Sequence, residues 1–279
     1  MSCNGKCESC QAQGTCSDET KAQAQRQGHA VDHIRRKLVV MSGKGGVGKS
    51  TMAVQLARAL AASGERVGLL DVDLHGPSIP LLMGVAGARM VGTGTSIQPI
   101  VCGPIKVASV GFLLENPDAA IIWRGPVKIG VIQQFLDNVE WGELDSLVVD
   151  CPPGTGDEPL TVCQSIGQNA GAVIVTTPQQ IAAADVARSI SFCGDVGLPV
   201  WGLVENMSGF VCPHCGQVTD IFGSGAGERL ANKFGIPFAG KIPLDASVCA
   251  NGDKGLPMAG KIVAEAIESV VANILQAAG

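Results

Sequence analysis

Residues 43–51 read Gly43-Lys44-Gly45-Gly46-Val47-Gly48-Lys49-Ser50-Thr51. A glycine, four further residues and then Gly-Lys-Ser form the pattern of a phosphate-binding loop (P-loop), which requires a strand before it and a helix after it. The apolar run 37–41 precedes the pattern, and an alanine- and leucine-rich segment, 51–62, follows it. The sequence therefore predicts a strand, a loop that cradles phosphates, and a helix.

The residue types of this loop fit phosphate binding. Glycines let backbone N–H groups converge on phosphate oxygens, and the start of the following helix adds the positive end of its dipole. Lys49 is expected to reach the β- and γ-phosphates, and Ser50 to hold Mg²⁺. The predicted nucleotide-binding set is Gly43, Lys44, Gly45, Gly46, Val47, Gly48, Lys49, Ser50 and Thr51. A flexible glycine-rich turn is the alternative, which the strand-loop-helix context disfavours.

Lys44 occupies a position that the generic pattern leaves open. Lys49 already serves the phosphates, and a second lysine in the same cradle would crowd it. Lys44 resembles the signature lysine of the deviant Walker A ATPases, in which that residue reaches across a dimer to the partner's nucleotide. A positive charge supplied in trans can raise the rate of phosphoryl transfer by orders of magnitude. The resemblance implies a homodimer with a catalytic Lys44; a solvated loop lysine is the alternative.

Composition indicates a compact protein without a charged binding face. The 279 residues suffice for one large domain, or for one domain with a tail, and 46% are hydrophobic while 16% are charged. The net charge is −5 and the only dense basic run is 35–37, which predicts no nucleic-acid partner. No apolar stretch approaches the ~20 residues of a membrane span, and the N-terminus does not resemble a secretion signal. We expect no membrane partner and a cytoplasmic location.

Two regions are expected along the chain. Residues 1–30 are polar, with hardly an aliphatic side chain, so they form a tail organised by something other than packing. Residues 31–279 form a P-loop ATPase domain. The predicted strands are 37–41, 66–72, 105–110, 146–150, 172–176, 200–205 and 237–242, with helices between them such as 125–138 and 181–193. This alternation predicts an α/β fold with a mostly parallel, doubly wound sheet.

The last predicted helix, 260–277, has an apolar stripe that is expected to pack on the sheet. The stripe consists of Ile262, Val263, Ala266, Ile267, Val270, Val271, Ile274 and Leu275. Glu265 and Glu268 lie on its opposite face, which argues against a basic membrane-surface helix.

Two predicted strands end in aspartates. Asp71 and Asp73 are two residues apart, so their side chains point to the same side at the carboxyl end of the strand, where open α/β sheets bind ligands. The segment 71–78 resembles switch I of the same ATPases, which implies that Asp73 orients the attacking water or takes its proton. A capping role is the alternative for both residues. Asp150 ends the apolar run 146–150 in the manner of a Walker B strand, with its carboxylate toward Mg²⁺.

Two further segments complete the expected nucleotide switch. The sequence Cys-Pro-Pro-Gly-Thr-Gly-Asp at 151–157 looks like switch II, whose glycines could turn a backbone N–H toward the γ-phosphate. Asn206, after the strand 200–205, matches an asparagine that contacts the purine base in related ATPases. A turn-forming asparagine is the alternative at that position.

Eleven cysteines point to metal or cluster chemistry rather than to disulfides in a reducing compartment. Cys212 and Cys215 form a two-cysteine knuckle, whose sulfurs can face one metal. Two thiolates are half a site, so two chains about a two-fold axis could hold one [4Fe-4S] cluster or one zinc. Cys-Pro-His-Cys is also a thiol-disulfide redox motif, but Gly216 and a strand-like segment follow it here instead of a helix.

The tail contains a second group of cysteines, Cys3, Cys7, Cys10 and Cys16. Four thiolates in so short a segment can wrap one [4Fe-4S] cluster, and binding would supply the folding free energy that the tail lacks. Zinc fits the same ligands.

Taken together, the P-loop with Lys44, the segments 71–78, 150–157 and 205–208, and the Cys212–Cys215 knuckle resemble the Mrp family of iron-sulfur cluster carrier ATPases. The resemblance runs from about residue 37 to the end. The tail is similar to that of the subgroup of cytosolic cluster-assembly scaffolds, whose first cysteine normally lies much farther upstream than Cys3; His29 or water is the alternative fourth ligand. The resemblance implies a stable cluster in the tail and a labile bridging cluster at the knuckle.

This resemblance implies a homodimeric ATPase that binds ATP, ADP, Mg²⁺ and [4Fe-4S] clusters and hands the clusters to apo-proteins. An ATP-gated electron donor of the nitrogenase iron-protein type would take its cluster cysteines from two separated segments. A metal-insertion ATPase for nickel would favour more histidines than the four present. A positioning ATPase that binds membrane or DNA would need a basic helix or patch.

Overall fold

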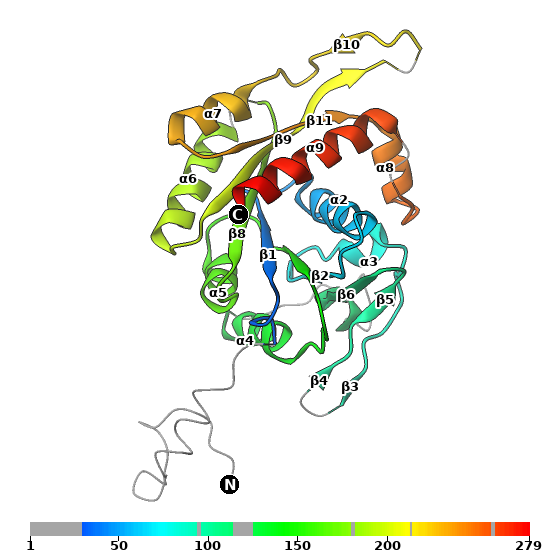
Figure 1. Ribbon diagram of the computed structural model, residues 1–279, viewed down its shortest axis with the longest axis vertical. Helices are drawn as coiled ribbons and strands as arrows, with labels where there is room; N and C mark the ends of the chain where they lie inside the picture. The colour runs from blue at the N-terminus through cyan, green and yellow to red at the C-terminus, as the bar shows by residue number, and fades with distance from the viewer. Residues whose placement is uncertain (1–29, 94–95, 114–124, 180–181, 213, 258–259) are drawn as a thin grey trace, which may run out of the picture.

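The structure, a computed structural model, describes residues 30–93, 96–113, 125–179, 182–212, 214–257 and 260–279. Within these residues a sheet is covered by helices on both faces (Figure 1). Its strands are β1 (Arg36–Met41), β2 (Val67–Asp71), β5 (Ile100–Cys102), β6 (Ile105–Ser109), β7 (Ser146–Asp150), β8 (Ala170–Thr176), β9 (Val200–Val211), β10 (Val218–Thr219) and β11 (Phe238–Leu244). β3 (Gly92–Thr93) and β4 (Ser96–Ile97) pair in a separate hairpin. The tail cysteines at positions 3, 7, 10 and 16 lie outside the described residues.

The strand order is β10-β9-β8-β1-β7-β2-β6-β5, and β11 pairs with β9. Pairing is parallel from β11 through β9, β8, β1, β7 and β2 to β6, whereas β5 and β10 are antiparallel. Every residue of β2, β7 and β8 is buried, as expected for parallel strands covered on both faces. The predicted α/β fold with a mostly parallel sheet is confirmed. The P-loop strand β1 lies at its centre, between β7 and β8.

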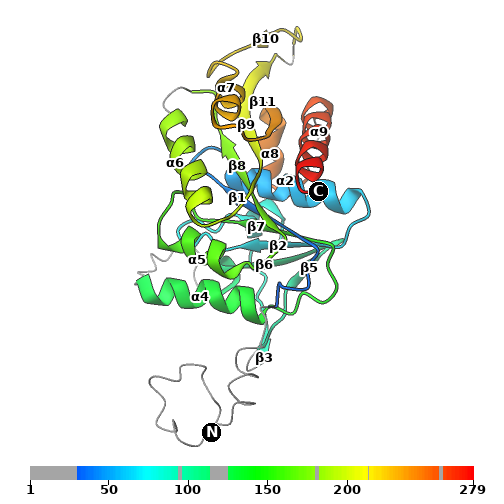
Figure 2. The same cartoon turned by 60° about the vertical axis from the view of Figure 1, so that its left-hand side comes forward.

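The helices cover the sheet in two layers (Figures 1 and 2). One layer holds α2 (Lys49–Ala62), α3 (Ile79–Leu82), α8 (Ala246–Gly252) and α9 (Lys261–Ala277); the other holds α4 (Gly125–Asn138), α5 (Asp157–Ser165), α6 (Ala182–Asp195) and α7 (Ala226–Phe234). Each layer has its own core, such as Leu56 and Leu60 of α2 on one side and Phe135 and Leu136 of α4 on the other. Each buried side chain of this kind stabilises the fold by about 1.5–3 kcal/mol.

Two expectations need correction. β9 does not end near residue 205 but continues to Val211, because β11 and β10 extend the pairing along it. In α9 the buried stripe contains Val263, Ile267, Val270, Val271 and Ile274, whereas Ile262 is 51% exposed. Ile262 lies at the border of the stripe in the first turn of α9, so its side chain does not pack against the sheet. A membrane span would need a longer apolar helix than any in the described part of the chain.

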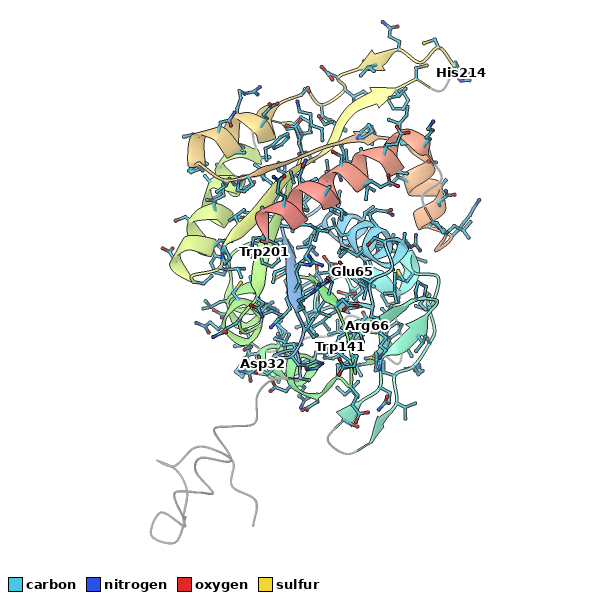
Figure 3. The ribbon with its side chains drawn as sticks, viewed as in Figure 1. Asp32, Glu65, Arg66, Trp141, Trp201 and His214 are labelled. Atoms are coloured by element: carbon cyan, nitrogen blue, oxygen red, sulfur yellow. The ribbon has the colours of Figure 1, made fainter. Side chains whose placement is uncertain are left out.

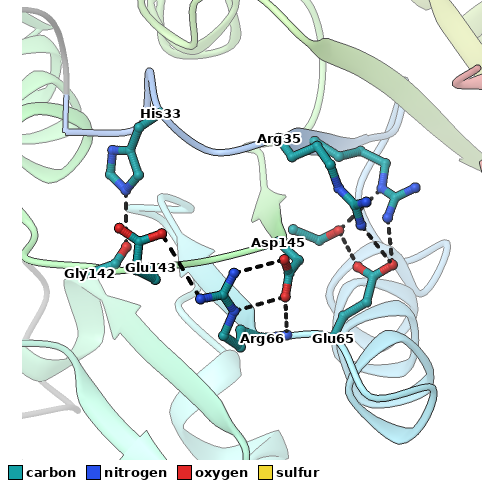
Figure 4. Close-up of polar contacts among 9 residues, drawn as sticks. His33, Arg35, Glu65, Arg66, Gly142, Glu143 and Asp145 are labelled. Carbon is teal, nitrogen blue, oxygen red and sulfur yellow. Dashed lines mark hydrogen bonds and ion pairs between the residues drawn. The ribbon is translucent and has the colours of Figure 1, made fainter.

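Ion pairs tie together the amino-terminal edge of the sheet, where β1, β2 and β7 begin (Figure 4). The Glu65 carboxylate accepts hydrogen bonds from Arg36 Nη2 at 2.5 Å and from Ser146 Oγ at 2.5 Å. Arg66 donates two hydrogen bonds of 3.0 Å to the Asp145 carboxylate, which hold the pKa of Asp145 well below its usual range. These contacts fix the amino-terminal edge of the sheet. The P-loop lies at the opposite, carboxyl-terminal edge.

Candidate nucleotide site and cysteine knuckle

The P-loop joins β1 to α2 at the carboxyl-terminal edge. Gly46 and Gly48 have φ values of +80° and +84°, in the left-handed region that favours glycine. A Cβ on Gly43 would come within 2.5 Å of the carbonyl oxygen of Asp185, and one on Gly48 would collide with the Asn206 amide. No described side chain caps α2, whose N-cap is Gly48. The first N–H groups of α2 therefore face the loop without a side-chain acceptor, as a phosphate cradle requires.

Three strand ends bring charged groups to one point beside this loop. Lys49 Nζ lies 2.5 Å from Asp150 Oδ1 after β7 and 3.3 Å from Asp73 Oδ2 after β2. Burial disfavours the ammonium, but the carboxylates of Asp150 and Asp73 outweigh burial and raise the pKa of Lys49. Lys49, Asp73 and Asp150, which the sequence assigned separately, thus form one buried cluster.

Asp150 has the features of a Mg²⁺ ligand. It is fully buried, and its Oδ2 accepts no hydrogen bond from the described residues. Burial raises the pKa of Asp150, although Lys49 and the Ser50 side chain counteract part of that rise. A buried carboxylate oxygen without a donor, next to a serine hydroxyl, offers the hard oxygen ligands that Mg²⁺ prefers. Ser50 and Asp150 therefore fit the cation predicted for them.

Asp71 organises the turn that presents Asp73. Asp71 Oδ2 accepts a hydrogen bond of 2.8 Å from Ser109 Oγ, and Asp71 Oδ1 accepts one of 3.1 Å from the Asp73 backbone N–H. Its complete burial, with the Asp150 carboxylate adding to the effect, raises the pKa of Asp71 to about 8. Asp71 is therefore a buried support for the turn, and Asp73 is the carboxylate of this pair that meets Lys49.

Residues 151–157 run against the P-loop. The Gly154 N–H donates a hydrogen bond of 2.8 Å to the Ser42 carbonyl, with φ at +90°. α5 begins directly afterwards, and Glu158 in its first turn lies 3.0 Å from Lys128 of α4 and 3.6 Å from His75 of the predicted switch I. This Lys128–Glu158–His75 group links the two predicted switches. Sequence reasoning missed it because nothing in the chain order relates α4 to residue 75.

The Lys44 ammonium is available to another molecule. The backbone carbonyl of Lys44 accepts a hydrogen bond of 2.9 Å from Ser42 Oγ, and the residue is half-buried. Among the described residues, no hydrogen bond or ion pair reaches Lys44 Nζ. Lys44 therefore differs from Lys49, whose ammonium is saturated by carboxylates of its own chain.

A cavity of about 280 Å³ opens beside the P-loop. Gly48, Thr51 and Gln55 of the loop and α2 line it, together with Asn206, Met207 and the segment from Pro243 to Asp245. Asn206 Nδ2 donates a hydrogen bond of 2.9 Å to the Val47 carbonyl, so Asn206 contacts the loop and faces the cavity at once. Gln55 Nε2 is buried without a partner in the described part of the chain. Nothing in the sequence singles out Gln55, a polar residue within the apolar part of α2.

The knuckle lies on an arm formed by the end of β9 and by β10. Figure 3 places His214 at the tip of this arm, away from the body of the sheet. Backbone N–H groups of His214 and Cys215 donate hydrogen bonds to Cys212 Sγ and lower the pKa of the Cys212 thiol. The Gly216 N–H closes the turn onto the Cys212 carbonyl at 2.9 Å. A sulfur that accepts backbone N–H groups is prepared to act as a thiolate ligand.

The knuckle provides only part of a ligand set. Cys215 is exposed and Cys212 half-buried, and the described residues contain no group of three or more His, Cys, Asp or Glu side chains that could hold a metal. By contrast, burial raises the pKa of Cys163 to about 12 and that of Cys193 to about 11, which makes these core thiols poor ligands. A four-ligand metal site at the knuckle would therefore need two further ligands from elsewhere.

Comparison with known proteins gives a consistent result. The chain is 48% identical over 260 residues to the iron-sulfur cluster carrier protein of Methanocaldococcus jannaschii, covering 92% of this chain and 90% of that protein. It is 48% identical over 227 residues to the human cytosolic Fe-S cluster assembly factor NUBP2, covering 80% and 84%. Among solved structures, a nucleotide-binding protein of Archaeoglobus fulgidus in complex with ADP matches with a TM-score of 0.70 and 44% identity over 80% of this chain and 87% of that one.

The cell division ATPase MinD of Pyrococcus furiosus shares the fold alone, with a TM-score of 0.61 and 21% identity over 87% of this chain and 99% of that one. The model of the ParA family described as NUBPL iron-transfer P-loop NTPase matches residues 33–278, which include both the P-loop and the knuckle. The chain therefore belongs to the NUBPL iron-transfer P-loop NTPase family.

Proposed function

We propose that this chain is an ATPase that carries or assembles [4Fe-4S] clusters as a homodimer and transfers them to apo-proteins. The observation that carries the proposal is the position of Asn206. This residue faces the cavity beside the P-loop and stands at the root of the arm that holds Cys212 and Cys215. Relatives named as an iron-sulfur cluster carrier and as a cytosolic Fe-S cluster assembly factor support it.

The nucleotide half of the proposal assigns a role to each residue of the charged cluster. Lys49 would exchange its carboxylates for the β- and γ-phosphates, and Asp73, released from Lys49, would orient the attacking water. Ser50 and Asp150 would hold Mg²⁺, which supplies positive charge to the phosphates when bound. Asn206 would border the base, and Lys44 of the partner subunit would complete the charge neutralisation in trans. The products are ADP and phosphate.

The cluster half treats [4Fe-4S] as cargo. One knuckle supplies two thiolates, so two knuckles about a two-fold axis supply the four that a cluster needs. The tail, with Cys3, Cys7, Cys10 and Cys16, would hold a second, stable cluster. The proposed location is the cytoplasm, and the proposed partners are a second copy of this chain and apo iron-sulfur proteins rather than nucleic acid or membrane.

Anaerobic reconstitution with iron and sulfide tests the cluster half. Wild type, a Cys212→Ala/Cys215→Ala variant and a Cys249→Ala control, which removes another exposed cysteine, are compared by iron, sulfide and absorbance. We expect the double variant to lose about four irons per dimer and the control to lose none. Binding of zinc alone, or unchanged iron in the double variant, contradicts the bridging cluster.

A further inference from the structure

Residues 205–209 join the nucleotide cavity to the arm that carries the knuckle. At one side of this segment, Asn206 Nδ2 donates its hydrogen bond of 2.9 Å to the P-loop carbonyl of Val47. The Asn206 amide also fills the space that a side chain on Gly48 would need. Asn206 and Met207 line the cavity itself. A molecule that enters the cavity therefore meets this segment directly.

Glu205, one residue earlier in β9, holds the other side of the segment. It is fully buried, and its carboxylate accepts three hydrogen bonds. Oε1 accepts them from Ser208 Oγ at 2.5 Å and from the Gly225 N–H at 2.9 Å, and Oε2 accepts one from the Gly227 N–H at 2.6 Å. Gly225 and Gly227 belong to the start of α7, where the chain returns from the arm. Glu205 thus clamps both ends of the arm to the sheet.

The backbone between these contacts departs from regular strand geometry. Met207 adopts a φ of +58° and Gly209 one of +78°, so a non-glycine residue is held in the left-handed region between the P-loop contact and the arm. Neighbouring residues of a strand point to opposite faces, so Asn206 reaches the P-loop while Glu205 reaches α7. A shift of Asn206 must therefore displace Glu205 or break its hydrogen bonds.

We propose that Glu205 is a positioning residue that transmits the occupancy of the nucleotide cavity to the sulfurs of Cys212 and Cys215. Its role in cluster transfer rests on the function proposed above, but the coupling itself concerns only the nucleotide and the two thiols. The carboxylate is suited to this role because one side chain contacts the start of the arm, at Ser208, and its return, at Gly225 and Gly227. Both strands of the arm then move as one unit.

Cysteine alkylation in the protein without iron-sulfur cluster tests the coupling independently of cluster binding. The rates at which iodoacetamide modifies Cys212 and Cys215 are measured by peptide mass spectrometry, with and without saturating ATP and Mg²⁺. In wild type we expect ATP to change at least one rate by about fivefold or more. In Glu205→Gln, the amide N–H₂ would face a backbone donor instead of accepting from it. We therefore expect the ratio of the alkylation rates with and without ATP to fall to near one, while the nucleotide affinity stays near that of wild type.

Matched variants separate coupling from folding. Ser208→Ala removes one hydrogen bond of the clamp with little change of volume, and Ser208→Thr retains the hydroxyl and should restore the ATP effect. Glu228→Gln, on the exposed side of α7, is the control and should behave as wild type. If ATP leaves both alkylation rates unchanged in wild type, or if folded Glu205→Gln and Ser208→Ala keep the wild-type ratio, the coupling is refuted. Iron content after reconstitution remains a separate test of the bridging cluster.

Discussion

The nucleotide edge of the sheet and the knuckle arm differ in how much of their chemistry one chain contains. At the nucleotide edge, the buried carboxylates of Asp73 and Asp150 both lie within 3.3 Å of the buried Lys49 ammonium. On the arm, Cys215 is exposed, and Cys212 Sγ accepts hydrogen bonds from backbone N–H groups of its own turn. The first region is preorganised by the core, and the second is open and contributes two thiols.

This difference fits the roles proposed for the two regions. A phosphate site works by fixed charges, so it benefits from burial between central strands, where the positions of side chains are determined by packing. A site that accepts and releases cargo must be reached from outside, and an exposed turn held by few contacts serves that purpose. Lys44 resembles the arm more than it resembles Lys49. Its ammonium has no hydrogen-bond or ion-pair partner among the described residues, whereas Lys49 is held by two carboxylates.

The largest effect is expected at the buried cluster. Lys49→Met should abolish ATP turnover, and it should also reduce the free energy of unfolding by about 3–5 kcal/mol, because it leaves the Asp150 and Asp73 carboxylates buried without their cation. Urea unfolding and phosphate release measure the two effects. An inactive variant with wild-type stability would show that the cluster is less tightly coupled to the core than its geometry indicates.

Lys44→Ala should lower ATP turnover by about a thousandfold, as expected for loss of a cation acting in trans, with an unchanged melting temperature. Mixing this variant with Asp73→Asn provides the decisive control. The Asp73→Asn chain still supplies Lys44, and the Lys44→Ala chain still has Asp73, so mixed dimers should regain activity. If mixing restores nothing, Lys44 acts within its own chain or not at all.

The sequence predicted most of the nucleotide edge because its residues follow a fixed spacing. The spacing of Gly43, Gly48, Lys49 and Ser50 and the positions of Asp71, Asp73 and Asp150 at strand ends were sufficient to place them at one edge. Pairings between distant segments carry no such signal. Glu205 looked like the end of an apolar run, and its donors Gly225 and Gly227 lie at the start of a helix some twenty residues later.

A glycine-to-alanine pair compares the two regions with the same chemical change. Gly48→Ala meets both a left-handed backbone and the Asn206 amide, so it should weaken nucleotide binding by more than tenfold and destabilise the protein by about 1–3 kcal/mol. Gly216→Ala, at φ +71° with open space around its Cβ, should cost only about 1 kcal/mol within the arm and leave the melting temperature nearly unchanged. Calorimetry and nucleotide titration of both variants provide the measurement. Equal losses of stability would contradict the separation of the arm from the core.

A further effect concerns the pH dependence of the nucleotide edge. The pKa of Asp71 is raised from 3.8 to about 8 in the folded protein, so the folded state retains a proton that the unfolded state loses. The contribution of Asp71 to stability is therefore complete below the unfolded pKa and is lost as the pH rises through the folded pKa.

Asp71→Asn keeps the size of the side chain and its capacity for hydrogen bonds, but it cannot ionise. The metal-free variant should therefore lose less stability than wild type between about pH 4 and pH 8. Urea unfolding across this range, with Asp145→Asn as the control at the opposite edge of the sheet, decides the question. Parallel curves for wild type and Asp71→Asn would show that folding does not raise the pKa of Asp71.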